Sequence, residues 1–170
     1  MKLPFGFLSI FSFITLLFPI FANSQPLKSN SIIYLFSNKT KAELDSTINV
    51  SKLSIAESYS LIDTIYQVDK RYRDSLNRYN SGTTKFRYFI SMIAINDAVN
   101  QKILLKVLRK YGWPCKKLQI ADKASLIAWH SNLYTFQEFF SYINKCKDSI
   151  NAGLYSQFED RAKAFEKLRN

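Results

Sequence analysis

Apolar residues recur every three or four positions along two long stretches of the chain, which is the spacing of one face of an α-helix. The first stretch covers residues 54–79 and the second covers residues 84–111. No proline interrupts them, because none occurs between Pro26 and Pro114. Gly112 directly follows the second stretch, where glycine commonly ends a helix. The pattern therefore predicts two long helices.

The remainder of the chain shows the same period over shorter stretches. We expect a third helix to begin near Asp122, to continue or restart at Thr135 and to stop at Gly153, with a last helix behind it. Residues 39–48 also look helical, although their apolar spacing is weaker. The pattern predicts an all-α fold, with a single helical bundle-like domain of four to six helices over residues 54–170.

The first 24 residues differ from the rest. Lys2 precedes an apolar run without charge, residues 5–21, and residues 22–24 (Ala-Asn-Ser) supply small side chains for a cut. This layout is typical of a secretory signal peptide, although a run of about seventeen residues is also near the lower limit for an uncleaved membrane anchor. We expect cleavage and export to the periplasm or outside the cell, with no transmembrane segment afterwards and a partly ordered segment over residues 25–53.

The charge balance bears on the choice of partner. The chain has a formal net charge of +11, of which the leader holds only Lys2. Such an excess draws a protein toward anionic surfaces, which outside the cytoplasm are lipid headgroups, acidic glycans or cell-wall polymers rather than nucleic acid. The basic residues cluster on the second predicted helix, as Lys102, Lys106, Arg109 and Lys110. The alternative is an ordinary solvated face with no dedicated partner.

Two cysteines and one histidine limit the chemistry of the chain. In an oxidising compartment Cys115 and Cys146 are able to form one disulfide, which would close a loop of about thirty residues and contribute roughly 3 kcal/mol. The sequence alone leaves open whether the two sulfurs meet. His130 and two distant cysteines match no zinc-binding spacing, so we expect no metal site. No motif predicts a cofactor.

Several polar residues interrupt the apolar stripes of the predicted helices. Burying an unpaired charge is unfavourable, so such residues are expected to meet one another or to line a wet cleft. Two outcomes stay open, a satisfied buried network that fixes helix register or a polar site in the centre of the bundle. The candidate residues are Asp69, Arg73, Asp97, Asn100, His130, Gln137, Asp160 and Arg161.

Five short motifs follow one another between residues 66 and 161, namely Asp69-x3-Arg73, Asp97-x2-Asn100, Tyr111-Gly112-Trp113-Pro114, His130-x6-Gln137 and Asp160-Arg161. In this order and spacing they resemble the motifs of an uncharacterised bacterial domain-of-unknown-function family of exported helical proteins. The resemblance implies an exported helical domain and the same site candidates. It implies no reaction, because that family has no established activity.

The chain departs from the family pattern at two places. The position two residues after His130 is commonly acidic in the family, whereas it is Asn132 in this chain. The family pattern also continues beyond the Asp160-Arg161 pair into a segment with glycine and glutamine, where this chain has lysines and arginine up to Asn170. If that segment completes an active site, this protein keeps only the scaffold.

Two classes of function remain open. The first is a binding or structural module of the cell envelope or periplasm, with an anionic envelope surface or a protein as its partner. The second is a hydrolase or lyase of unknown substrate. In that enzyme His130 would be the general acid or base, with Asp69 or Asp97 orienting it. Arg73 or Arg161 would hold an anionic group of the substrate.

Overall fold

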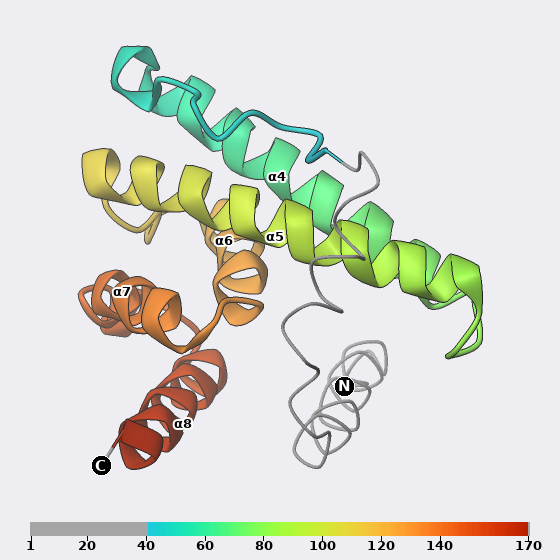
Figure 1. Ribbon diagram of the computed structural model, residues 1–170. Coiled ribbons are helices and arrows are strands. Elements are labelled where there is room, and N and C mark those ends of the chain that lie inside the picture. The colour runs from blue at the N-terminus through green and yellow to red at the C-terminus, as the bar shows by residue number, and fades with distance from the viewer. Residues whose placement is uncertain (1–40, 170) are drawn as a thin grey trace, which may run out of the picture. The chain divides into compact units, whose positions relative to one another are not determined.

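The computed structural model describes residues 41–169, which contain five α-helices, two short 3-10 helices and no strand (Figure 1). The all-α prediction is therefore confirmed. The leader, residues 1–24, and the first part of the predicted segment 25–53 lie outside the described residues. The elements are η1 (Val50–Lys52), α4 (Ile55–Leu76), α5 (Thr84–Tyr111), α6 (Leu118–Trp129), α7 (Leu133–Asn144), η2 (Lys147–Ser149) and α8 (Ala152–Arg169).

The two long predicted helices are α4 and α5. Helix α4 starts with a capping box, in which the Ser54 hydroxyl accepts from the backbone N–H of Glu57 and the Glu57 carboxylate accepts from the N–H of Ser54. It ends at Leu76, three residues before the predicted end at Tyr79. The reason is local, because the N–H groups of Arg78 and Tyr79 bond to carbonyls three residues back and tighten the chain into a turn.

Helix α5 has the predicted bounds. The Thr83 hydroxyl accepts from the N–H of Phe86 at 3.1 Å and caps the first turn. At the other end Gly112 adopts φ 74°, a left-handed conformation that glycine reaches without steric cost, and its N–H bonds to the carbonyl of Leu108. Pro114 prevents the helix from resuming.

The predicted start of the third helix, near Asp122, is one turn too late. Helix α6 begins at Leu118, because the turn after Pro114 leads directly into it. In that turn the N–H of Lys117 donates to the carbonyl of Pro114 at 2.9 Å, and the N–H groups of Ile120 and Ala121 both donate to the carbonyl of Lys117. The first helical turn therefore forms without a side-chain cap.

The restart near Thr135 occurs, but the predicted stop at Gly153 is wrong. Asn132 caps α7 by accepting from the N–H of Thr135 at 3.1 Å, so α7 begins at Leu133. Gly153 lies in the first turn of α8, and the Asn151 side chain accepts from its N–H at 2.9 Å. Because the Asn151 side chain accepts from first-turn N–H groups, Gly153 lies at the start of a helix here and does not end one.

The prediction of a helix over residues 39–48 is also wrong for its described part, residues 41–48, which forms bends and a turn. This part runs along α5, with the N–H of Glu43 donating to the Asn96 side chain at 3.0 Å. Lys106 donates to the carbonyls of Ser46 and Ile48, and Lys110 donates to the carbonyl of Ser51, just beyond this segment, at 2.8 Å. The Lys106 side chain thus takes carbonyls that a helix over residues 39–48 would have bonded internally. Two lysines of the predicted basic patch are therefore occupied by backbone carbonyls.

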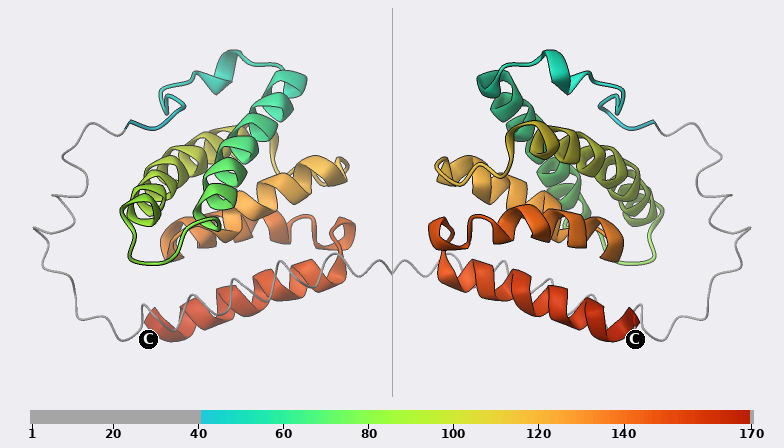
Figure 2. Two further views of the ribbon diagram at one scale, coloured as in Figure 1. Left: turned by 90° about the vertical axis from the view of Figure 1, so that its right-hand side faces the viewer. Right: turned by 90° about the vertical axis from the view of Figure 1, so that its left-hand side faces the viewer.

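From one side of the domain to the other, the helices lie in the order in which they follow along the chain, with α4 and α5 on one side and α8 on the opposite side (Figure 2). Helices α4 and α5 lie side by side, α6 contacts both of them, and α7 packs against α6 and α8. The end of α6 also meets α8, where the ring centre of Trp129 lies 5.5 Å from that of Phe158. A disulfide between Cys115 and Cys146 ties the segment after α5 to the end of α7, with 5.8 Å between the two Cα atoms. Within residues 41–169 no helix combines the length and apolar character that a bilayer span requires.

Candidate functional site

Arg73 lies between two carboxylates on neighbouring helices. Its Nε donates to Oδ1 of Asp69, one turn earlier on α4, at 2.9 Å. Its Nη2 donates to both carboxylate oxygens of Asp97 on α5, at 2.9 and 2.8 Å. The side chain of Asp69 is only 6% exposed and that of Asp97 is 19% exposed. One guanidinium therefore serves two largely buried carboxylates, and it links α4 to α5.

His130 joins this group from the end of α6, where it is the C-terminal capping residue. Its Nδ1 lies 3.4 Å from Oδ1 of Asp69, although the geometry is not that of a hydrogen bond and Nδ1 has no bonding partner among the described residues. The backbone carbonyl of His130 accepts from Nε2 of Gln101 on α5 at 3.3 Å. We call Asp69, Arg73, Asp97 and His130 the ionic cluster.

Arg161 on α8 supports the turn that presents His130. Its guanidinium donates to the carbonyls of Trp129 and Ser131, the neighbours of His130 on either side, the second at 2.8 Å. The same guanidinium lies 4.7 Å from the ring centre of Trp129 and 4.6 Å from that of Phe136. Burial lowers the pKa of Arg161 to about 10. Arg161 is thus a structural clamp on the turn, and within residues 41–169 its guanidinium forms no ion pair with a carboxylate.

The other predicted site residues lie outside the ionic cluster. Asn100 is buried one turn beyond Asp97 and donates to the backbone carbonyl of Ile65 on α4 at 3.2 Å. Gln137 is half-buried, and its side chain makes no hydrogen bond to a described residue. Asp160 is exposed, because one step along α8 from the clamped Arg161 turns its side chain toward solvent. The assignment of Gln137 and Asp160 to one cluster is therefore wrong.

Burial and mutual repulsion set the protonation of the ionic cluster. Burial, with the charge of Asp69 added to it and Arg73 opposing it, raises the pKa of Asp97 to about 7. Burial also disfavours ionisation of Asp69, but His130 and Arg73 outweigh it and hold the pKa of that carboxyl below its usual range. Burial and the charges of Arg73 and Arg161 lower the pKa of His130, against the opposing effect of Asp69. Near neutral pH the positive and negative charges of the ionic cluster therefore nearly cancel.

The raised pKa of Asp97 predicts a pH effect on stability. The native Asp97 carboxyl holds its proton up to about pH 7, whereas in the unfolded chain it releases the proton near pH 3.8. The free energy of unfolding therefore falls as the pH rises from about 3.8 to about 7. His130 acts in the opposite direction below pH 6.5. The Asp97→Asn variant isolates the first effect. We expect the free energy of unfolding of the wild type, relative to Asp97→Asn, to fall by about 1–3 kcal/mol between pH 4.5 and pH 8.

Urea denaturation at several pH values measures this difference. The matched control is Asp160→Asn, which removes an exposed carboxyl. We expect its difference from the wild type to change little over the same range. A wild-type advantage over Asp97→Asn that grows with pH would contradict the assignment of a raised pKa to Asp97.

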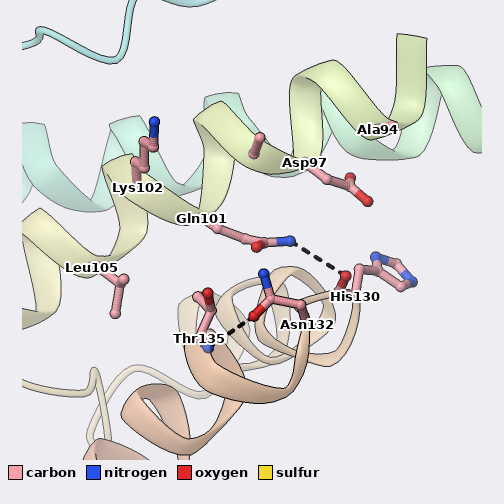
Figure 3. Close-up of a pocket in the computed structure, with 9 residues that line it drawn as sticks. Ala94, Asp97, Gln101, Lys102, Leu105, His130, Asn132 and Thr135 are labelled. Carbon is pink, nitrogen blue, oxygen red and sulfur yellow. Dashed lines mark hydrogen bonds between the residues drawn. The ribbon is translucent and has the colours of Figure 1, made fainter. Parts of the chain in front are cut away.

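The ionic cluster opens on one side into a pocket of about 330 Å³ between α5 and the turn that joins α6 to α7. Figure 3 shows the carboxyl of Asp97 and the imidazole of His130 at one end of this pocket, with the amide of Gln101 beside them. The lining residues are Ala94, Asp97, Ala98, Gln101, Lys102, Leu105, His130, Asn132 and Thr135.

Sequence reasoning missed most of the pocket lining. Gln101 lies on the same stripe as Leu104 and Leu108 and is only 8% exposed, so its position among apolar residues was a usable signal. Thr135 indicated only the restart of a helix, and Asn132 was noted only as a departure from the family pattern. Ala98 is an exposed small residue, and no pattern along the chain distinguishes it from other surface alanines.

The arrangement allows two kinds of chemistry. A half-buried pocket with polar groups at one end is able to hold a small polar ligand. A carboxylate beside Nδ1 of a histidine that faces a pocket is also the arrangement of a general acid–base pair. Neither arginine lines the pocket, since Arg73 lies between two carboxylates and Arg161 donates to two backbone carbonyls. Among the described residues no group of three His, Cys, Asp or Glu side chains gathers at a spacing suited to a metal ion.

Comparison with protein-family models, with curated proteins and with solved structures finds no match to this chain. The resemblance to a family of exported helical domains therefore remains a prediction.

Proposed function

We propose that this chain is an exported binding module whose ligand occupies the pocket between α5 and the α6–α7 turn. One observation carries the proposal, which is that Asp97 and His130 both line this pocket, while Arg73 donates to Asp97 and Asp69 lies 3.4 Å from Nδ1 of His130. A network needed only for helix register has no reason to face an opening. The pattern of the leader and the disulfide both suit an oxidising compartment outside the cytoplasm.

Filling the pocket tests this proposal. Ala98 is exposed and lines the pocket, so Ala98→Phe is expected to occupy the space without disturbing the core. We expect a screen of small polar compounds by 1H–15N NMR to find binders that shift the backbone signals of Gln101 and Thr135. In Ala98→Phe these compounds should lose at least tenfold in affinity.

The matched control is Ala164→Phe, which adds the same ring at an exposed position of α8. It should leave the affinities unchanged. A screen whose binders shift only residues elsewhere in the domain, or bind Ala98→Phe as well as the wild type, would contradict the proposal.

A second candidate function, a hydrolase or lyase, is favoured by the 3.4 Å approach of Asp69 to Nδ1 of His130. The carboxylate would orient the imidazole, and the other ring nitrogen would exchange a proton with the substrate. For this enzyme we expect His130→Gln to fold and still bind pocket ligands, yet to lose the function of the protein when it replaces the wild type in the source cell. A folded His130→Gln protein that restores the wild-type phenotype would exclude this candidate.

A further inference from the structure

The chemistry of the pocket lining narrows the class of ligand, an inference that rests on the proposed function. The charged groups at the inner end are already paired. Both oxygens of Asp97 accept from Arg73, and Arg73 also serves Asp69. A charged ligand group at this end would find no free counter-charge, and burying it there would be unfavourable. The inner end therefore favours an uncharged ligand.

Two neutral groups on opposite walls have unused hydrogen-bonding capacity. On α5 the Gln101 side chain is nine-tenths buried, and its Nε2 is taken by the carbonyl of His130 while its Oε1 has no bonding partner among the described residues. On the α6–α7 turn Oδ1 of Asn132 is taken by the N–H of Thr135. Its Nδ2 has no partner within residues 41–169, and Figure 3 shows it directed toward α5. The pocket thus offers one acceptor and one donor on facing walls.

A secondary amide has the complementary pair of groups. Its N–H suits Oε1 of Gln101, and its carbonyl suits Nδ2 of Asn132. The rest of the floor is apolar and small, with Ala94 and Ala98 one turn apart on α5 and Leu105 further along. Small side chains on a helix let another backbone approach closely, and Leu105 offers a surface for a short aliphatic group.

The pocket also has the length of a short peptide. From Ala94 to Leu105 it follows α5 for eleven residues, or about 16 Å at 1.5 Å per residue. An extended peptide rises about 3.3 Å per residue, so roughly five residues cover this distance. Lys102 stands at the solvent side, and Figure 3 shows its amine directed away from Asn132 and His130. The ammonium group is therefore placed outside the zone that would hold the amide.

We infer that the pocket binds a short, uncharged, extended peptide segment, with one peptide group between Gln101 and Asn132 and a small aliphatic side chain over Ala98 and Leu105. The peptide could belong to a partner protein or be free, because the recognised group is the same in both. Recognition of an amide through paired neutral hydrogen bonds discriminates strongly against analogues that lack one of its two groups.

Four probes of similar size test the ligand class by NMR titration of the purified protein. They are N-acetyl-alanine N-methylamide (the neutral dipeptide), its carboxylate analogue N-acetyl-alanine, its cationic analogue alanine N-methylamide, and N-acetylglucosamine. The sugar is neutral and carries one secondary amide, but it has neither an extended peptide backbone nor an aliphatic side chain to lie over Ala98 and Leu105. We expect the neutral dipeptide to bind at least fivefold more tightly than each of the others, with the largest shifts at Gln101, Asn132 and Thr135. An equal or tighter affinity for a charged probe or for the sugar would overturn the inference, as would the absence of binding by the dipeptide.

The Asn132→Asp variant tests the proposed geometry. Asp is as good a helix cap as Asn, so α7 should keep its start, but the donor Nδ2 is replaced by an acceptor. We expect at least a tenfold loss of affinity for the neutral dipeptide. The matched control is Asn144→Asp, which adds the same charge at the other end of α7, where Oδ1 of Asn144 accepts from Tyr155. It should bind as the wild type does.

The outcomes separate this inference from the proposed function. Unchanged binding in Asn132→Asp would overturn the amide geometry alone. A charged probe or the sugar that binds in the pocket more tightly than the dipeptide would overturn the ligand class, while the binding module would stand. If the Ala98→Phe test also failed, the proposed function would fall with it.

Discussion

Replacing Arg73 by methionine is expected to lower the free energy of unfolding by about 3–5 kcal/mol at pH 7.5. The substitution keeps most of the side-chain volume but leaves Asp69 and Asp97 facing each other without the cation that both accept from. Both carboxylates are largely buried, so water replaces the lost hydrogen bonds poorly. The loss should be smaller at pH 5, because protonation of Asp97 removes the repulsion. Urea denaturation at the two pH values measures both effects.

The matched control for this variant is Arg71→Met on the same helix. The guanidinium of Arg71 also pairs with a carboxylate, that of Glu43, but its side chain is 59% exposed. A surface pair of this kind is expected to contribute less than about 1 kcal/mol. If Arg73→Met cost no more than Arg71→Met, the ionic cluster would not be the electrostatic link between α4 and α5.

Removing the disulfide is expected to have the second large effect. The bond between Cys115 and Cys146 joins residues 31 apart and restricts the unfolded chain, so the Cys115→Ser/Cys146→Ser double variant should lose about 3 kcal/mol of stability. The segment it anchors connects α5 to α6, and α7 carries the cap at Asn132. Chemical denaturation with and without a reducing agent measures the effect.

The reducing agent supplies the control for the double variant. It should lower the stability of the wild type to about the level of the double variant and leave the double variant unchanged. Equal stability of the oxidised wild type and the double variant would contradict a stabilising role for the bond. Signals of Asn132 and Thr135 that stay in place in the folded double variant would show that the pocket does not depend on it.

The helices could be predicted wherever local chemistry decides them. Helix α5 was predicted at both ends because its apolar spacing continues from residue 84 to residue 111 and Gly112 follows directly. In the structure the Thr83 hydroxyl also caps its first turn. The prediction that a helix ends at Gly153 was wrong, because glycine is compatible with either end of a helix. The nearby Asn151 side chain caps the first turn of α8 and so places Gly153 at a helix start. The prediction of a helix over residues 41–48 was wrong for another reason. Lys106, some sixty residues away along the chain, takes the carbonyls of Ser46 and Ile48 in this segment.

The ionic cluster was predictable only in part. The position of Asp69 and Arg73 four residues apart on one helix made their pairing readable from the sequence. That Asp97 lies opposite Arg73 depends on the relative register of α4 and α5. That His130 approaches Asp69 depends on where α6 ends against α4. Gln137 has the same periodic relation to its stripe as the true members have, yet α7 places it outside the cluster.

The sequence by itself determined the all-helical character of this protein, the bounds of α5 and the choice of polar residues that interrupt apolar faces. These depend on contacts within a few residues, whose geometry a helix fixes. Only the tertiary structure decided which of those residues share one guanidinium, and that the shared group opens into a pocket lined by Gln101 and Asn132. Such juxtapositions arise from the packing of helices that are distant in sequence, and periodicity along one helix carries no information about its neighbour's register.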